Sequence, residues 1–93
     1  MIVPRRQFPL GAYVGPRTPT EHRLTEIWRT ALGTDQVGIT DRYEDLGGDS
    51  MLAASIFVEI EETFRIAMPM ALLVDAPTVE ELARKIDQLV SRQ

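Results

Sequence analysis

Residues 45–54 read DLGGDSMLAA, a stretch that predicts the start of a long helix. Two glycines, an aspartate and a serine precede an amphipathic run, and either Asp49 or Ser50 can cap the helix. Gly47 and Gly48 allow backbone conformations closed to other residues and leave room for another group to approach closely. The Ser50 hydroxyl is therefore expected at an exposed helix N-terminus, where the helix dipole favours a negative group. The spacing leaves two interpretations: a simple cap, or a serine that receives a phosphoester.

The apolar pattern after this start predicts a helix over residues 50–65, which Pro69 prevents from continuing. Its core face consists of Ala53, Ile56, Phe57, Ile60 and Phe64. The opposite face carries Met51, Ala54 and Val58, bordered by acidic residues. Exposed apolar groups bordered by charge are typical of a docking face, although single exposed apolar residues are also common.

Two capping boxes predict two further helices. Thr18 begins one, followed by Pro19 at the first helical position and by Glu21, which is expected to reach back to the cap. Thr78 begins the other, and residues 70–75 are expected to form a short helix before it. No segment shows sustained strand alternation. The sequence thus predicts an all-α fold, a small bundle of three main helices plus one short helix.

Residues 34–49 form a long connection, which in a small domain is usually either disordered or functional. Its four apolar residues predict that it packs against the core, with a short helical turn at residues 41–46. These anchors are Val37, Ile39, Tyr43 and Leu46.

The chain of 93 residues predicts one domain. Residues 1–16 are rich in proline and glycine and are expected to form a flexible leader, followed by the domain at residues 17–93. Cysteine is absent, and the N-terminus lacks the apolar centre of a signal peptide. No apolar run is long enough to span a membrane. A cytoplasmic location without membrane association is therefore expected.

The net charge of −4 is unevenly distributed. Residues 1–33 carry five arginines against two glutamates, whereas residues 34–93 carry five basic residues against twelve acidic ones. An acidic body disfavours nucleic acid, because phosphate binding needs clustered lysine and arginine. It suits a partner with a basic surface, or it only keeps the protein in solution.

Catalysis by the chain itself is not expected. The elbow pattern G-x-S-x-G lacks its second glycine, because Leu52 stands two places after Ser50. The one histidine, His22, is expected on the solvent side of the first helix rather than near the serine. The acidic residues of the loop do not match the spacing of a calcium loop, so no metal site is predicted.

The segment LGGDSMLA, residues 46–53, resembles the attachment motif LGG-[HD]-S-[LIM]-x-A of acyl and peptidyl carrier proteins. Four further segments are similar to carrier domains of nonribosomal peptide synthetases, in the family's order, and the resemblance covers about residues 13–90. They are YVGPRTPTE at 13–21, IWRTALG at 27–33, VGITDRYEDLGGDS at 37–50 and APTVEELA at 76–83.

The resemblance implies a four-helix carrier fold in which Ser50 receives 4′-phosphopantetheine from coenzyme A through a separate, magnesium-using transferase. Gly48 and Asp49 would belong to this cofactor-binding motif, and Asp49 would assist the transfer. The thiol of the arm would carry an acyl or aminoacyl group as a thioester, in agreement with a chain that has no cysteine. Many peptidyl carriers have histidine at the position of Asp49, so the cargo class stays open.

The resemblance also implies partners. A monomeric carrier would be docked by three kinds of enzyme. These are a phosphopantetheinyl transferase, an acyl- or aminoacyl-activating ligase, and downstream synthases or transferases of lipid, polyketide or nonribosomal peptide synthesis. Their contacts would be Met51, Ala54, Val58, Met70 and Leu73. The first Met and the early end after the last helix suggest a free-standing carrier, although a domain cut from a synthetase would read the same.

Two alternatives belong to other classes. An unmodified helical adaptor would bind a protein partner through its acidic face and would gain no mass from coenzyme A. A serine hydrolase would turn over esters on its own.

Overall fold

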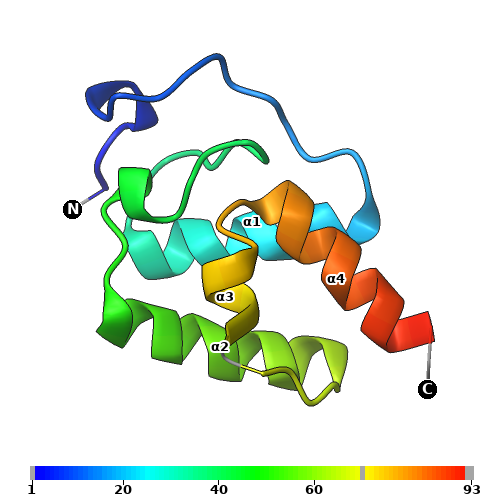
Figure 1. Ribbon diagram of the computed structural model, residues 1–93. Coiled ribbons are helices and arrows are strands. Elements are labelled where there is room, and N and C mark those ends of the chain that lie inside the picture. The colour runs from blue at the N-terminus through cyan, green and yellow to red at the C-terminus, as the bar shows by residue number, and fades with distance from the viewer. Residues whose placement is uncertain (1, 70, 92–93) are drawn as a thin grey trace.

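Four α-helices make up the fold of the computed structural model, which describes residues 2–69 and 71–91 (Figure 1). They are α1 at Pro19–Leu32, α2 at Ser50–Phe64, α3 at Ala71–Asp75 and α4 at Val79–Ser91. Short 3₁₀ turns lie at Arg5–Gln7 and Glu44–Leu46. Among the described residues there is no strand, so the predicted all-α bundle of three main helices and one short helix is confirmed.

Helix α1 begins as its capping residues predict, with one difference. The Thr18 side chain accepts a hydrogen bond from the backbone N–H of Glu21 at 3.1 Å, and Pro19 is the first helical residue. The Glu21 carboxylate does not complete the expected capping box. It accepts from the backbone N–H of Arg17 at 2.8 Å, one residue before the cap, and so also fixes the chain that enters the helix.

The C-terminal end of α2 and the start of α4 are also set by residues next to them in sequence. Helix α2 ends at Phe64, and Arg65 adopts a left-handed conformation with φ of 55°. The Thr78 hydroxyl accepts from the backbone N–H of Glu81 at 3.3 Å, as the second capping motif predicts.

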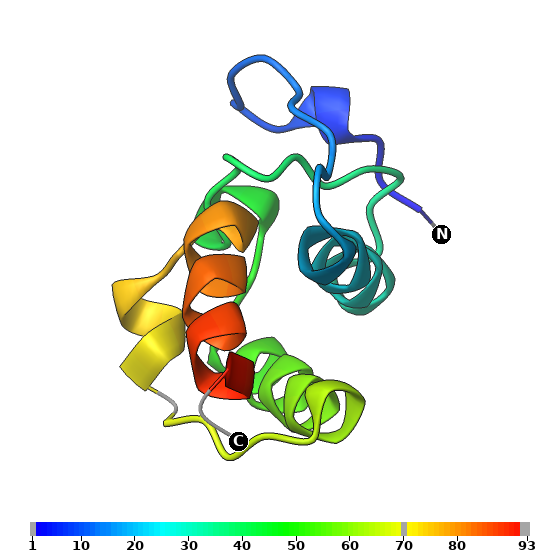
Figure 2. The same ribbon diagram turned by 90° about the vertical axis from the view of Figure 1, so that its right-hand side faces the viewer.

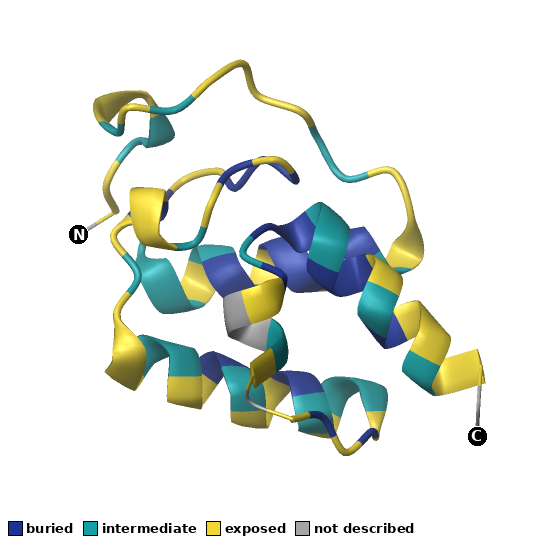
Figure 3. Ribbon diagram, viewed as in Figure 1, coloured by how far each residue is buried: buried dark blue, intermediate teal, exposed yellow. Residues whose placement is uncertain are grey.

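Helix α1 packs against both α2 and α4, while α3 packs on α4 (Figures 1 and 2). The buried apolar residues form one continuous core. Figure 3 marks the buried positions along the ribbon. The largest members of the core are Trp28, Leu24, Ile39, Leu46, Ile56, Ile60, Leu82 and Ile86. Burial of these groups supplies the main driving force for folding.

The loop between α1 and α2 is packed down at one end of the bundle, as its apolar anchors predict. Val37, Ile39 and Leu46 are buried, and Tyr43 packs against the core. The helical turn predicted at residues 41–46 is present but shorter, as a 3₁₀ turn at Glu44–Leu46.

The segment that precedes α1 crosses this same end of the molecule and lies over the loop (Figures 1 and 2). Val3 forms an isolated bridge with Thr34, and its N–H donates to the Gly33 carbonyl at 2.7 Å. The segment therefore contacts the body of the domain, while the division into a flexible leader at 1–16 and a domain at 17–93 stays a prediction.

Candidate functional site

Ser50 is the first residue of α2, and it is exposed. Asp49 is the cap of the helix, because its Oδ1 accepts a hydrogen bond from the backbone N–H of Leu52 at 2.9 Å. This settles the choice between the two possible caps that the sequence allows. Within the described residues the Ser50 hydroxyl makes no hydrogen bond, so the fold leaves it available to an external group.

The two glycines before this serine serve different purposes. Gly47 ends the 3₁₀ turn in a left-handed conformation with φ of 85°, which favours glycine. Gly48 has no positive φ, but a Cβ atom there would overlap the ring of Tyr43. The group that approaches Gly48 closely is thus a side chain of the same loop, and close approach by another molecule stays a prediction.

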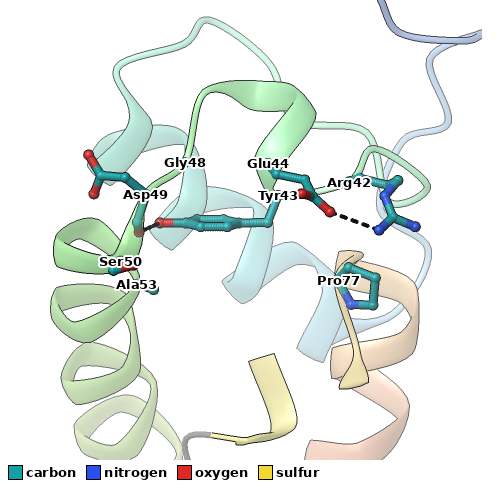
Figure 4. A pocket seen from close by; sticks show the side chains of 8 residues that line it. All are labelled: Arg42, Tyr43, Glu44, Gly48, Asp49, Ser50, Ala53 and Pro77. Carbon is teal, nitrogen blue, oxygen red and sulfur yellow. Dashed lines mark hydrogen bonds and ion pairs between the residues drawn. The ribbon is translucent and has the colours of Figure 1, made fainter. Parts of the chain in front are cut away.

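Tyr43 holds the loop in the position that presents Ser50. Its hydroxyl donates to the backbone carbonyl of Asp49 at 2.7 Å (Figure 4). Its N–H donates to the carbonyl of Pro77 at 2.8 Å. The ring meets Trp28 edge to face, with centroids 5.4 Å apart. Burial, and then the nearby Asp49 carboxylate, raise the pKa of the Tyr43 phenol, so it stays a neutral donor.

Sequence reasoning identified Tyr43 only as a packing anchor and missed this contact. The phenol itself could have indicated a hydrogen bond, because a buried tyrosine usually donates its O–H to a partner. No local pattern, however, names a carbonyl six residues ahead as that partner.

A pocket of about 350 Å³ opens beside Ser50 (Figure 4). Tyr43, Ala53 and Pro77 contribute to its lining. The ion pair between Arg42 and Glu44, 2.8 Å apart, also borders it. The pocket gives a group attached to Ser50 an apolar surface and both signs of charge within reach.

Three of the predicted docking residues share the exposed side of α2. Met51 is 85% exposed and Val58 is 52% exposed, and Ala54 between them is exposed as well. Met70 lies outside the described residues. Leu73 belongs to α3, but its side chain also lies outside what the structure describes.

His22 is exposed and lines a different pocket from the one at Ser50, as the sequence predicts. In residues 2–69 and 71–91, no three of the histidine, aspartate and glutamate side chains gather as a metal site. None of the helices in these ranges has both the length and the apolar character needed to cross a bilayer.

The family described as "Phosphopantetheine attachment site" matches residues 22–86, a range that includes the whole loop and the exposed serine. The chain belongs to this family, as a carrier domain of the nonribosomal peptide synthetase type. Its cofactor is a covalently attached 4′-phosphopantetheine.

Curated relatives of this carrier domain are much longer proteins. Tyrocidine synthase 3 of Brevibacillus parabrevis is 39% identical over 71 residues, which cover 76% of this chain and 1% of the relative. Chondramide synthase cmdD of Chondromyces crocatus is 42% identical over 79 residues, which cover 85% of this chain and 2% of the relative. The chain thus spans a very small part of each relative's length.

Solved structures agree on the carrier fold. A docking-domain complex of the Pax nonribosomal peptide synthetase, PaxA T1-CDD with PaxB NDD, matches with a TM-score of 0.84 at 28% identity, covering 90% of this chain and 81% of that one. The peptidyl carrier family is also represented by the complex of the phosphopantetheine transferase Sfp with coenzyme A and a peptidyl carrier protein. That match has a TM-score of 0.79 at 29% identity and covers 82% of this chain and 99% of the matched chain.

Proposed function

We propose that Ser50 is the residue that carries 4′-phosphopantetheine. The observation that supports it best is the exposed hydroxyl at the first position of α2, where Asp49 has taken the role of cap. This hydroxyl has no hydrogen bond to the part of the chain that the structure describes. The other serine within the family match is Ser55, which lies in the middle of α2 rather than at its start.

The arrangement suits a phosphodiester on Ser50. Transfer would join the serine oxygen to the phosphorus of the phosphopantetheine unit and would release the serine proton and adenosine 3′,5′-bisphosphate. Ser50 stands at the N-terminal end of α2, where the helix dipole favours the negative phosphodiester. Once bound, the arm supplies the thiol that holds an acyl or aminoacyl cargo as a thioester.

The carrier delivers this cargo by docking to enzymes of nonribosomal peptide synthesis, and it performs no chemistry itself. The docking face that we propose consists of Met51, Ala54 and Val58, bordered by the exposed acidic residues Glu59 and Glu62. Its proposed partners are a phosphopantetheinyl transferase, an activating ligase and downstream synthase enzymes, and the Sfp complex supports the first of these. The cytoplasm, where coenzyme A is available, is the proposed location.

The test is direct loading of the purified chain. The 93-residue protein is incubated with coenzyme A, Mg²⁺ and a broad-specificity phosphopantetheinyl transferase, and its intact mass is measured. The parent and Ser55→Ala should each gain one phosphopantetheinyl group, whereas Ser50→Ala should gain none. Ser55 is a matched control because it is an exposed serine of the same helix.

An unchanged parent mass would contradict the proposal and would favour the unmodified adaptor. Loading of Ser50→Ala would show that another hydroxyl carries the arm.

A further inference from the structure

Arg5 lies in the segment before α1, yet its guanidinium holds a carboxylate of the loop that leads to Ser50. Its Nε donates to Asp41 Oδ2 at 2.6 Å, and its Nη2 donates to Asp41 Oδ1 at 2.6 Å. The Nη2 group also donates to the carbonyl of Gly11 at 3.0 Å. Two parallel charge-assisted bonds fix orientation as well as distance, so this contact fastens two segments that are remote in sequence.

Asp41 needs such a partner because it is buried. Its side chain is 2% exposed and that of Arg5 is 11% exposed. Its Oδ2 also accepts from the backbone N–H of Gly38 at 2.8 Å, which closes a tight turn inside the loop. A buried carboxylate that loses its cation is strongly destabilising, because one remaining amide does not replace the lost solvation.

The same segment touches the loop at its beginning and at its end. The backbone N–H of Asp35 donates to the carbonyl of Val3 at 3.2 Å, and the N–H of Arg5 donates to Asp35 Oδ1 at 2.7 Å. The ring of Phe8 lies 3.6 Å from the position that a Cβ atom of residue 47 would take, beside Gly47. Residues 3–8 therefore lie along the loop as a strap, with the Arg5 contact in the middle.

The strap is connected to the serine through two residues of the loop. Asp41 is separated from Tyr43 by a single residue, and the Tyr43 hydroxyl donates to the carbonyl of Asp49 at 2.7 Å. Asp49 in turn immediately precedes Ser50. Fixing Asp41 thus restricts the side chain that fixes the backbone at the modification site.

We propose that Arg5 is a positioning residue for the modification of Ser50, acting through Asp41 and Tyr43. The inference rests on the proposed attachment of phosphopantetheine at Ser50. When the contact between Arg5 and Asp41 is broken, the loop adopts additional conformations, and the productive orientation of the hydroxyl is populated for a smaller fraction of the time. The segment before α1 is then part of the working unit of the carrier.

The experiment compares Arg5→Gln, Arg5→Lys and Arg6→Gln in the full chain. Two quantities are measured at a temperature at which circular dichroism shows each variant folded: kcat/KM for phosphopantetheine transfer from coenzyme A, and the amide chemical shifts of Gly48, Asp49 and Ser50. Arg5→Gln should lower kcat/KM about tenfold and shift these amide signals, because small misplacement of a reacting group is costly. Arg5→Lys keeps the charge without the two-pronged geometry and should lie between Arg5→Gln and the parent.

Arg6→Gln is the matched control, since Arg6 is an exposed arginine of the same short turn, and it should behave as the parent. Parental kcat/KM and parental amide signals in Arg5→Gln would overturn the proposal, even if its unfolding temperature falls, because a purely structural role lowers only stability. If Arg5→Gln does not fold, the same two readouts in Arg5→Lys decide. Failure of the parent itself to gain mass would instead contradict the proposed function.

Discussion

The Tyr43 hydroxyl donates a hydrogen bond to the backbone carbonyl of Asp49, 2.7 Å away. This contact joins the middle of the loop to the residue that caps α2, and it passes over Gly48, where a Cβ would overlap the Tyr43 ring. The ring also meets Trp28 edge to face. The position of Ser50 therefore depends on a packed side chain of the loop as well as on the helix that follows.

Tyr43→Phe removes this hydrogen bond and keeps the ring. We expect a loss of about 0.5–1 kcal/mol in the free energy of unfolding, since the net value of one such bond is modest and its acceptor lies near solvent. Urea denaturation followed by the fluorescence of Trp28, the one tryptophan, measures this loss. Tyr13→Phe is the control, because Tyr13 is 44% exposed and its hydroxyl makes no hydrogen bond within the described residues. Equal losses in the two variants would contradict a specific role for the contact.

Substitutions at the two glycines should separate backbone strain from steric overlap. Gly47→Ala is expected to cost about 1–2 kcal/mol because of its left-handed conformation, and Gly47→Asn should cost less, since asparagine tolerates that conformation. At Gly48 alanine should cost about 1–3 kcal/mol, because the Tyr43 ring must move, and asparagine should cost at least as much. Thermal or urea unfolding measures all four variants. An asparagine rescue at Gly48 would show that strain, not overlap, requires this glycine.

Local chemistry accounts for what the sequence predicts well. The helix caps at Thr18 and Thr78 join residues three positions apart. The apolar residues on one face of a helix also recur every three or four positions, so both partners of each contact can be read from a short stretch of sequence. The anchors of the loop were predictable for a similar reason, because four apolar residues in a polar stretch must be buried somewhere.

Contacts between remote residues were not predictable. The pair of Arg5 and Asp41 spans 36 positions, and neither residue differs by pattern from the other arginines and aspartates of the chain. The choice of Asp49 over Ser50 as cap was also undetermined, because both side chains suit a cap and they are adjacent. Sequence alone thus located the exposed serine but not the side chains that hold it in place.

Lowering the pH should reduce the free energy of unfolding, because Glu21 becomes protonated. Its carboxylate is 5% exposed. Hydrogen bonds from the Arg17 side chain hold the pKa of Glu21 below its ordinary value of 4.5. Burial acts in the opposite direction, and the hydrogen bond from the Arg17 backbone lowers the pKa further. Because the pKa of Glu21 is lower in the folded chain than in the unfolded chain, its ionised carboxylate stabilises the fold at any pH above the unfolded-state pKa. This stabilisation is lost as the pH falls through the folded-state pKa. The free energy of unfolding of the parent should therefore fall more steeply below pH 4.5 than that of Glu21→Gln.

Urea unfolding across pH 7 to about pH 2.5 measures this difference. Glu26→Gln is the control, since Glu26 forms a comparable ion pair with Arg29 but its side chain is 68% exposed, and solvent weakens such pairs. Parallel pH profiles for the parent and Glu21→Gln would contradict a stabilising role for the ionised Glu21.

A charge placed on the exposed face of α2 should impair transfer without changing the fold. Met51→Glu and Val58→Glu substitute residues that are 85% and 52% exposed, so helical content should remain parental. Each should lower kcat/KM for loading at Ser50, the proposed attachment residue, or for transfer of the cargo, by about tenfold, because desolvating a charge at the centre of an interface is costly. Val90→Glu is the control, as an exposed valine of a different helix, α4, and it should load as the parent does. Parental rates in both α2 variants would move the docking face elsewhere on the carrier.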